Sequence, residues 1–443
     1  MAKDMTKGSI VKALIFFSIP LILSGLLQQL YSWADAFIVG NTEGEAALAA
    51  IGATQVVIGI LIMALTGLTS GISILSARYF GMKKDSLQKD ILSTFLIFYT
   101  AIFIVLSFVG YFLAEPLLSL LKTPSDIFKL ATSYLKISLI GIPFLTVYNT
   151  YAAILRGIGD SKAPLYSVLF STIINIILDI IFIIVFRWGV KGAAIATVIS
   201  QIIIALYIVF YARRKYKELH FDIKRSRIDN AVLKMGLSLS IPLAIQSTLS
   251  AAGNLILQSL MNSFGTTTVA AITTAYRIDS VILLPIVNLG VAVATITSQN
   301  FGANKIARMK KSLLSATVLM AVVSIALTTI VIVFGESLIK LFGVTTVSAQ
   351  IGARFFNILG YYYIVFGFAI VFKGYIEGIG RVRFTSASSI LSLIVRIVLS
   401  YILMDRFNNM VIAYAEAISW CYLLLMCGGM LVYLHIKPKE KSN

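Results

Sequence analysis

The sequence predicts an all-α integral membrane protein with twelve transmembrane helices in two six-helix lobes related by internal duplication. Of its 443 residues, 58% are hydrophobic and only 13% are charged, whereas soluble domains have roughly 45–50% and 25%. The apolar residues gather in stretches long enough for a helix to cross a bilayer, which takes roughly 20 residues. Short motifs of the first half also recur in the second half in the same order.

Charged or Gly/Pro-containing breaks separate the apolar segments from one another. Segment lengths and these breaks together predict helices at 11–39, 46–76, 91–113, 128–155, 164–186, 192–211, 231–262, 268–298, 312–334, 350–377, 384–404 and 410–435.

The two halves match each other at an offset of about 221 residues. Ser18-Ile19-Pro20 matches Ser240-Ile241-Pro242, and Gly157-Ile158-Gly159 matches Gly378-Ile379-Gly380. Transporter folds are commonly built from such repeats. Six spans return the chain to its starting side, so the repeats are expected to be parallel. We therefore predict a first lobe at 1–211, a basic linker at 212–230 and a second lobe at 231–443.

The formal net charge of +18 follows the predicted topology. Alternate connections are rich in Lys and Arg, and the linker has seven such residues between Arg213 and Arg227. Because basic residues in short loops stay on the cytoplasmic side, we expect a multi-pass protein of the cell membrane with both termini in the cytoplasm. No nucleic-acid partner is expected, and an added contact of the linker with anionic lipid headgroups stays open.

The few reactive side chains argue against catalysis and metal clusters. Cys421 and Cys427 lie in one apolar segment, and His220 and His435 lie far apart among basic residues, so neither a disulfide framework nor a zinc site is expected. We expect no cofactor and no enzyme activity. The run from Gly157 to Asp160 is interpreted as a turn that ends a helix, because the Tyr-Asp pair of intramembrane aspartyl proteases is missing from the sequence.

Two acidic residues lie well inside apolar segments, Asp35 in the first and Asp179 in the fifth. A carboxylate deep in a bilayer costs at least about 2.5–3.5 kcal/mol, so it normally faces a water-filled cavity or a partner and marks a pathway. The alternative is that Asp35 reaches water at the helix end while Asp179 bonds to a neighbouring helix.

Further polar residues share helix faces with these carboxylates. Gln28, Tyr31 and Asp35 fall at i, i+3 and i+7, and two further stripes are spaced at i and i+4, namely Asn175 with Asp179 and Thr197 with Gln201. Carboxylate, amide and hydroxyl oxygens suit a hard cation. The first lobe is therefore predicted to bind either a proton or Na⁺.

The second half lacks a copy of this pattern. At the same offset Asp35 corresponds to Ile256, Asp179 to Ser400 and Asn175 to Arg396. Other charged residues occur there instead: Arg277, Asp279, Lys373, Glu377 and Arg396. The spacing of Lys373 and Glu377 predicts an ion pair along one helix.

Several motifs together resemble the multidrug and toxic compound extrusion family of secondary transporters over the whole chain. They are Gln29-Leu30-Tyr31-Ser32-Trp33-Ala34-Asp35, the run from Leu155 to Pro164, Asn175-Ile176-Ile177-Leu178-Asp179, Gly192-Ala193-Ala194-Ile195-Ala196-Thr197 and Ser298-Gln299-Asn300-Phe301-Gly302-Ala303. Within the family the chain looks most like the prokaryotic branch named for a DNA-damage-inducible protein. Another branch has essential acids in helix 7, and no Asp or Glu occurs here between Ala231 and Ser263.

The resemblance implies which residues form the site. The cation-coupling group would be Asp35, Asn175, Asp179 and Thr197, and these would be the metal ligands if Na⁺ is the coupling ion. Tyr31 and Tyr134 would lie beside this group. The expected substrate cavity comprises Gln28, Tyr31, Tyr134, Gln201, Met63 and Met261. The two methionines suit an adaptable wall, although packing or contact with lipid is the more common role of such single positions.

The resemblance also implies the function. We expect a monomeric antiporter that exports cationic or amphipathic compounds in exchange for inward H⁺ or Na⁺ by alternating access. Its expected partners are such drugs and the lipid bilayer. The alternatives are a flippase for a lipid-linked sugar or another amphipathic lipid precursor, and a passive channel.

Overall fold

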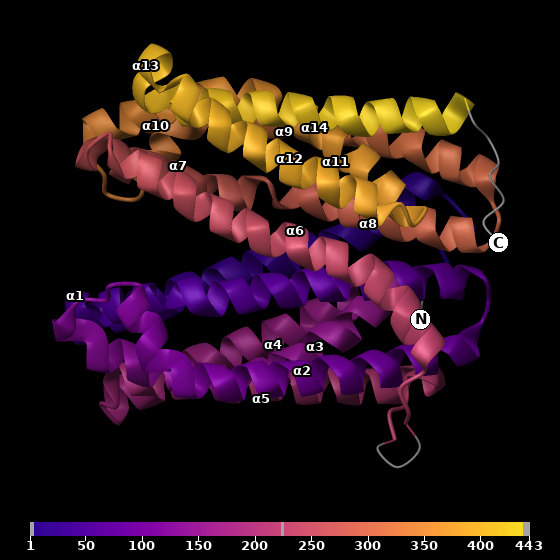
Figure 1. Cartoon of the computed structure of the whole chain (residues 1–443), viewed down its shortest axis with the longest axis horizontal. Helices are drawn as coiled ribbons and strands as arrows, with labels where there is room; N and C mark the ends of the chain where they lie inside the picture. The colour runs from indigo at the N-terminus through magenta and orange to yellow at the C-terminus, as the bar shows by residue number, and fades with distance from the viewer. Residues whose placement is uncertain (1–3, 223–225, 437–443) are drawn as a thin grey trace. The chain divides into compact units, whose positions relative to one another are not determined.

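The computed structural model describes residues 4–222 and 226–436 (Figure 1). Residues 223–225 of the predicted basic linker and the chain ends 1–3 and 437–443 lie outside the described residues. In the described part, eleven helices are long and apolar enough to cross a membrane. The protein is therefore an all-helical, multi-pass membrane protein.

The helices follow one another with short connections. In chain order they are α1 (Ile10–Gly81), α2 (Asp85–Leu120), α3 (Ser125–Gly157), α4 (Lys162–Asp179), the π-helix η1 (Ile180–Val185), α5 (Gly189–Lys215), the 3₁₀-helix η2 (Lys217–Leu219), α6 (Asn230–Asn262), α7 (Thr266–Ile282), α8 (Leu284–Gly302), α9 (Ile306–Lys340), α10 (Thr346–Leu359), η3 (Gly360–Tyr362), α11 (Tyr363–Gly378), α12 (Val382–Ile402), α13 (Met404–Phe407), η4 (Asn408–Met410) and α14 (Val411–Ile436).

Helix α1 accounts for two of the segments that hydropathy predicts. Its 72 residues correspond to about 108 Å at 1.5 Å per residue, far more than the roughly 30 Å of a hydrocarbon core. Gly44 interrupts the helix with φ 82° and ψ −171°, a conformation that glycine adopts without steric cost. The segments before and after Gly44 are each long enough to cross a bilayer.

The chain forms two compact units, each described here by itself. The first contains residues 20–244 with Asp4, and the second contains residues 5–19 and 245–436 of the described chain. The beginning of α1 thus belongs to the second unit, and the beginning of α6 belongs to the first. Both helices carry a proline near the change of unit, Pro20 in α1 and Pro242 in α6. A proline inside a helix removes one backbone hydrogen bond and favours a bend there.

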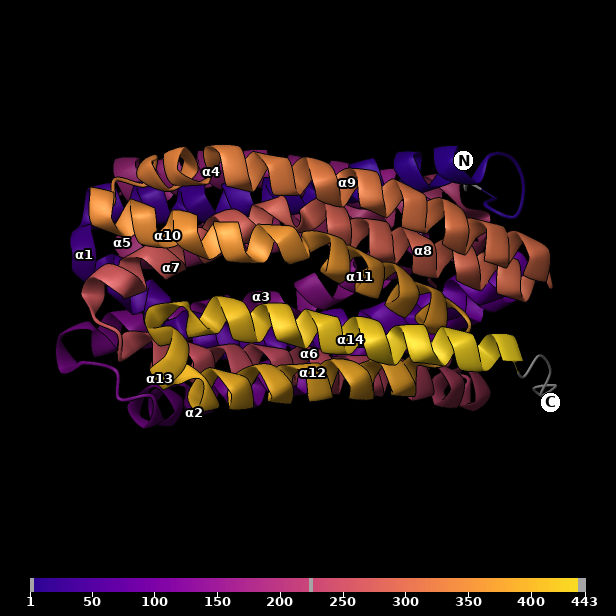
Figure 2. The same cartoon turned by 90° about the horizontal axis from the view of Figure 1, so that it is seen from above.

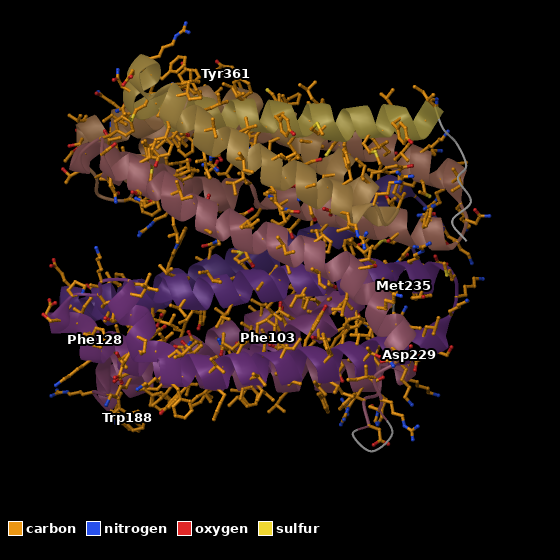
Figure 3. All side chains as sticks on the ribbon, viewed as in Figure 1. Phe103, Phe128, Trp188, Asp229, Met235 and Tyr361 are labelled. Carbon is orange, nitrogen blue, oxygen red and sulfur yellow. The ribbon has the colours of Figure 1, made fainter. Side chains whose placement is uncertain are left out.

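In the first unit, α3 packs against α2 and α5, and α4 packs against α5. Phe103 of α2, labelled in Figure 3, is buried in the hydrophobic core of this unit. The second segment of α1 approaches the beginning of α6 through two glycines four residues apart. A Cβ atom on Gly67 would lie 2.5 Å from Ala244 Cα, and one on Gly71 would lie 2.5 Å from the Ser240 backbone nitrogen. Small residues at this spacing let membrane helices pack with their backbones in contact.

In the second unit, α8 packs against α9 and α11, and α12 packs against α14, as Figure 2 also shows. One glycine contact recurs in both units. A Cβ on Gly157 would lie 2.8 Å from the Ser73 carbonyl oxygen, and one on Gly378 would lie 2.8 Å from that of Ala294. The members of the two pairs are 221 residues apart in each case, which matches the offset of the sequence repeat.

The segment that leads into α1 is held in the second unit by the end of α8 and the beginning of α9. Met5 is fully buried, and its backbone N–H donates to Gln299 Oε1 at 3.0 Å. Its carbonyl oxygen accepts a hydrogen bond from Arg308 Nε at 3.1 Å. Lys305 Nζ donates to the Thr6 carbonyl at 2.8 Å. These contacts reach the main chain of the segment and fix its path.

Candidate functional site

The first unit brings the predicted polar residues together from four helices. Asp35 lies in α1, Tyr134 in α3, Thr197 in α5, and Asn175 and Asp179 in α4. Asp35, Tyr134, Asn175 and Asp179 are all buried. Asp179 is the last α-helical residue before the π-helix η1. Short π-helical insertions occur frequently at functional sites because they change the direction of side chains relative to a regular helix.

The contacts within this group connect the two carboxylates with two tyrosines. The Tyr31 hydroxyl donates to Thr197 Oγ1 at 3.2 Å. Asp35 and Asp179 lie close enough to interact electrostatically with each other, and both also interact with Tyr31. Tyr134 lies within the same range of Asp35, Asp179 and Tyr31. The two carboxylates and the two tyrosines therefore form one largely buried, electrostatically coupled cluster.

This cluster contains several buried polar atoms without a hydrogen-bond partner among the described residues. They are Asp35 Oδ1, both carboxylate oxygens of Asp179 and both amide atoms of Asn175. Leaving a buried polar group unpaired costs about 1–3 kcal/mol, and more for a charged group. A bound proton, a cation or water would relieve that cost, and carboxylate, amide and hydroxyl oxygens are a suitable ligand set for a hard cation.

The remaining predicted cavity residues are placed differently. Gln201 Oε1 is buried without a partner among the described residues, and the Gln201 side chain rests against Gly141 of α3, where an added Cβ would overlap it. Gln28 and Met63 are exposed on the first unit, outside the buried cluster. Met261 is buried in the second unit.

Two further sequence interpretations are confirmed outside this pocket. Lys373 Nζ lies 3.7 Å from Glu377 Oε1, as their spacing predicts. Asp160 lies in the turn after α3 and is buried there. Its carboxylate accepts hydrogen bonds from Tyr216 at 2.6 Å, Lys215 at 2.8 Å and Tyr211 at 3.0 Å.

Asp160 also accepts hydrogen bonds from the backbone N–H groups of Lys162 and Ala163 at the start of α4. Burial alone would raise the pKa of Asp160, but the hydrogen bonds from Lys215, Tyr216 and Tyr211 outweigh burial and leave the pKa below its ordinary value. This carboxylate therefore ties the start of α4 to the end of α5, the two helices that carry Asn175, Asp179 and Thr197.

Sequence reasoning missed one intramembrane acid, Glu416 of α14. It is buried and lies 2.9 Å from Arg396. The signal that pointed to Asp35 and Asp179, a carboxylate within an apolar span, applies equally to Glu416.

Spanning helices, repeated helix packing and a buried polar cluster between helices are typical of a polytopic membrane transporter. The chain belongs to the MatE family, whose profile matches residues 20–181 and again residues 242–402. It is thus a membrane transporter and not an enzyme.

Among its relatives is the probable multidrug resistance protein YpnP of Bacillus subtilis (strain 168), which is 30% identical over 86% of this chain and 85% of its own. The multidrug export protein MepA of Staphylococcus haemolyticus is 25% identical over 85% of this chain and 83% of its own. The fold matches that of a MOP superfamily transporter from Pyrococcus furiosus with a TM-score of 0.89, 22% identity and 98% coverage of both chains.

Proposed function

We propose that this protein exports cationic or amphipathic drugs from the cell in exchange for inward H⁺ or Na⁺ by alternating access. The names of the relatives, a multidrug resistance protein and a multidrug export protein, support the substrate class. The observation that carries the proposal is the burial of Asp35 and Asp179 in one pocket with three of their four carboxylate oxygens unpaired among the described residues.

We further infer the architecture that this function needs. It comprises twelve spans, because α1 supplies two, in lobes at 1–211 and 231–443 joined by the linker at 212–230. The two profile matches and the repeated glycine contact support a duplication.

The alternation of basic loops supports a cell-membrane protein with both termini in the cytoplasm. The first-lobe acids support the branch named for the DNA-damage-inducible protein. The transporter is proposed to work as a monomer.

The proposed mechanism is competition for the two carboxylates. When both are ionised, the pocket attracts a cationic drug. An incoming ion neutralises this charge, with Asn175 and Thr197 supplying further oxygens, and drug affinity falls. The hydrogen bond from Tyr31 fixes the orientation of Thr197. Since linkage between two ligands is reciprocal, a bound drug likewise weakens binding of the ion, and this exchange is antiport.

Drug-stimulated ion flux in proteoliposomes tests the proposal, with Na⁺ and pH gradients imposed separately and ethidium as the drug. We expect ethidium transport to move one of the two ions and Asp35→Asn to abolish that coupling. Asp126→Asn, which changes an exposed carboxylate at the start of α3, is the matched control. Undiminished coupling in Asp35→Asn would contradict the assignment. Transfer of a lipid-linked sugar without ethidium-driven flux would favour the flippase.

A further inference from the structure

A second buried charged network lies entirely within the second unit, away from the proposed ion pocket. Its side chains come from four helices: Tyr276 and Asp279 of α7, Tyr363 of α11, Arg396 of α12 and Glu416 of α14. Asp279 is 4% exposed, Glu416 is 6% exposed and Tyr363 is fully buried. Burying charged groups at this depth is costly unless they are paired and hydrogen-bonded.

Arg396 and Glu416 form an ion pair. Arg396 donates through one terminal nitrogen to Glu416 Oε2 at 2.9 Å and to the Tyr276 hydroxyl at 2.7 Å. The Tyr276 hydroxyl in turn donates to the same Glu416 oxygen at 2.9 Å. The single positive charge of the network is thus paired with the Glu416 carboxylate.

Asp279 is left without an ion-pair partner among the described residues. Its Oδ1 atom accepts a hydrogen bond from the Tyr363 hydroxyl at 2.5 Å, and it lies within electrostatic range of both Glu416 and Arg396. When all three ionisable groups are charged, the network therefore carries two negative charges and one positive charge. One further cation is needed for neutrality.

The surroundings favour a proton over a metal ion as that cation. A hard metal ion needs several oxygen ligands, but the Glu416 oxygen nearest to Arg396 is already hydrogen-bonded to two donors. The Arg396 guanidinium group has only donors, so it cannot serve as a ligand for a metal ion. Arg396 occupies the repeat position of Asn175, so this lobe has a permanent positive charge where the first lobe has an amide.

The network also contains one buried donor that no described residue accepts from. Arg396 Nε is buried and has no hydrogen-bond partner among the described residues. Buried polar atoms of this kind are commonly satisfied by an ordered water. Phe355 packs edge-on against Tyr276 and Trp420 packs against Tyr363, so aromatic rings hold both tyrosines of the network in place.

We propose that Asp279 is a second proton-binding site, loaded and emptied during transport and separate from the Asp35/Asp179 pocket. A proton from water binds to the Asp279 carboxylate and forms the neutral acid, and it returns to water when the acid dissociates. The charged and titratable groups that face Asp279 are Tyr276, Tyr363, Arg396 and Glu416. The role in transport rests on the proposed antiport function, whereas proton binding itself does not.

Infrared titration of the purified full-length protein in lipid nanodiscs, from about pH 5 to about pH 9, reads the carbonyl stretch of protonated carboxyl groups directly. We expect Asp279→Asn to lose one such band that Asp35→Asn and Asp179→Asn retain. Tyr363→Phe keeps the carboxyl group and removes its hydrogen-bond donor, so it should shift the same band and its midpoint. Asp405→Asn, an exposed acid in the short helix α13, should leave the spectra unchanged.

Spectra of Asp279→Asn and Tyr363→Phe that are identical to those of the unchanged protein would overturn the proposal. Tyr363→Phe decides the question if Asp279→Asn does not fold. In proteoliposomes, Asp279→Asn should still exchange ethidium for ions but should move one proton fewer per ethidium. If Asp279→Asn has the same proton-to-ethidium ratio as the unchanged protein, Asp279 has no role in transport, even if its infrared band is lost. Failure of antiport in the unchanged protein would instead contradict the proposed function alone, since the infrared titration does not depend on transport.

Discussion

Replacing Asp179 by asparagine should weaken the dependence of drug binding on the coupling ion. The substitution keeps the shape of the side chain and removes one of the two buried charges in the first-unit pocket. Asp179 is fully buried, and neither of its carboxylate oxygens has a hydrogen-bond partner among the described residues. The change therefore removes a proposed ion-binding group and leaves the hydrogen bond between Tyr31 and Thr197 in place.

The expected magnitude follows from the number of carboxylates. If binding of one drug molecule displaces one ion, a tenfold change in ion concentration changes the drug Kd about tenfold. This change in Kd corresponds to about 1.4 kcal/mol of binding free energy. Two carboxylates in the pocket limit this exchange to two ions per drug. Loss of Asp179 should therefore lower the slope of log Kd against pH, or against log Na⁺ concentration, by about one. Over two pH units the drug Kd would lose about a 100-fold variation.

Equilibrium binding of ethidium to the purified protein measures this slope across a series of pH values and Na⁺ concentrations. With protons as the ion, binding to the unchanged protein should tighten as the pH rises, because protons compete with the drug. Asp126→Asn should have the slope of the unchanged protein. A slope that is the same in Asp179→Asn as in the unchanged protein, for both ions, would refute the reasoning.

Two further predictions concern the helices that carry the site. Asp160→Ala should lower the free energy of unfolding by about 2 kcal/mol, because it breaks a buried hydrogen-bonded pair with the partly exposed Lys215. Hydrogen bonding leaves the pKa of Asp160 below its ordinary value. The stabilising contribution of Asp160 should therefore be present at neutral pH and be lost only as the pH falls below about 4. Thermal unfolding measured at a series of acidic pH values would detect this loss. Gly71→Ala should destabilise by about 1–3 kcal/mol through overpacking against Ser240, whereas Gly52→Ala, with nothing within 4 Å of the added Cβ, should be neutral or stabilising in the same thermal assay.

Hydropathy predicted the positions of the spans well because a lipid environment leaves helices as the main way to satisfy the backbone. The predicted break between the first two segments, at 40–45, agrees with the interruption of α1 at Gly44. Hydropathy could not predict the form of that break, since it depends on the backbone angles of a single glycine. The match of Pro20 with Pro242 was visible in the sequence. The sequence did not show that both helices pass from one unit to the other close to these prolines. That property depends on contacts between residues far apart in the chain.

Helical spacing predicted which residues share a face, because the period of 3.6 residues fixes it. It did not predict burial, which depends on neighbouring helices. Gln28 and Asp35 share a face by spacing, yet Gln28 is exposed and Asp35 is buried. Tyr134 came from family resemblance alone, and the structure places it beside both carboxylates. The sequence of α3 has no stripe of polar residues at helical spacing that would have identified Tyr134.

The position of the segment before α1 has a consequence for biosynthesis. Met5 bonds to Gln299, a residue 294 positions later in the chain, and residues 5–19 belong to the second unit. Residues 5–19 can therefore make these contacts only after the ribosome has synthesised the chain as far as Gln299, near the end of α8. Until then this segment lacks its partners in the second unit, so its native position is reached after the helices of the first unit have been synthesised.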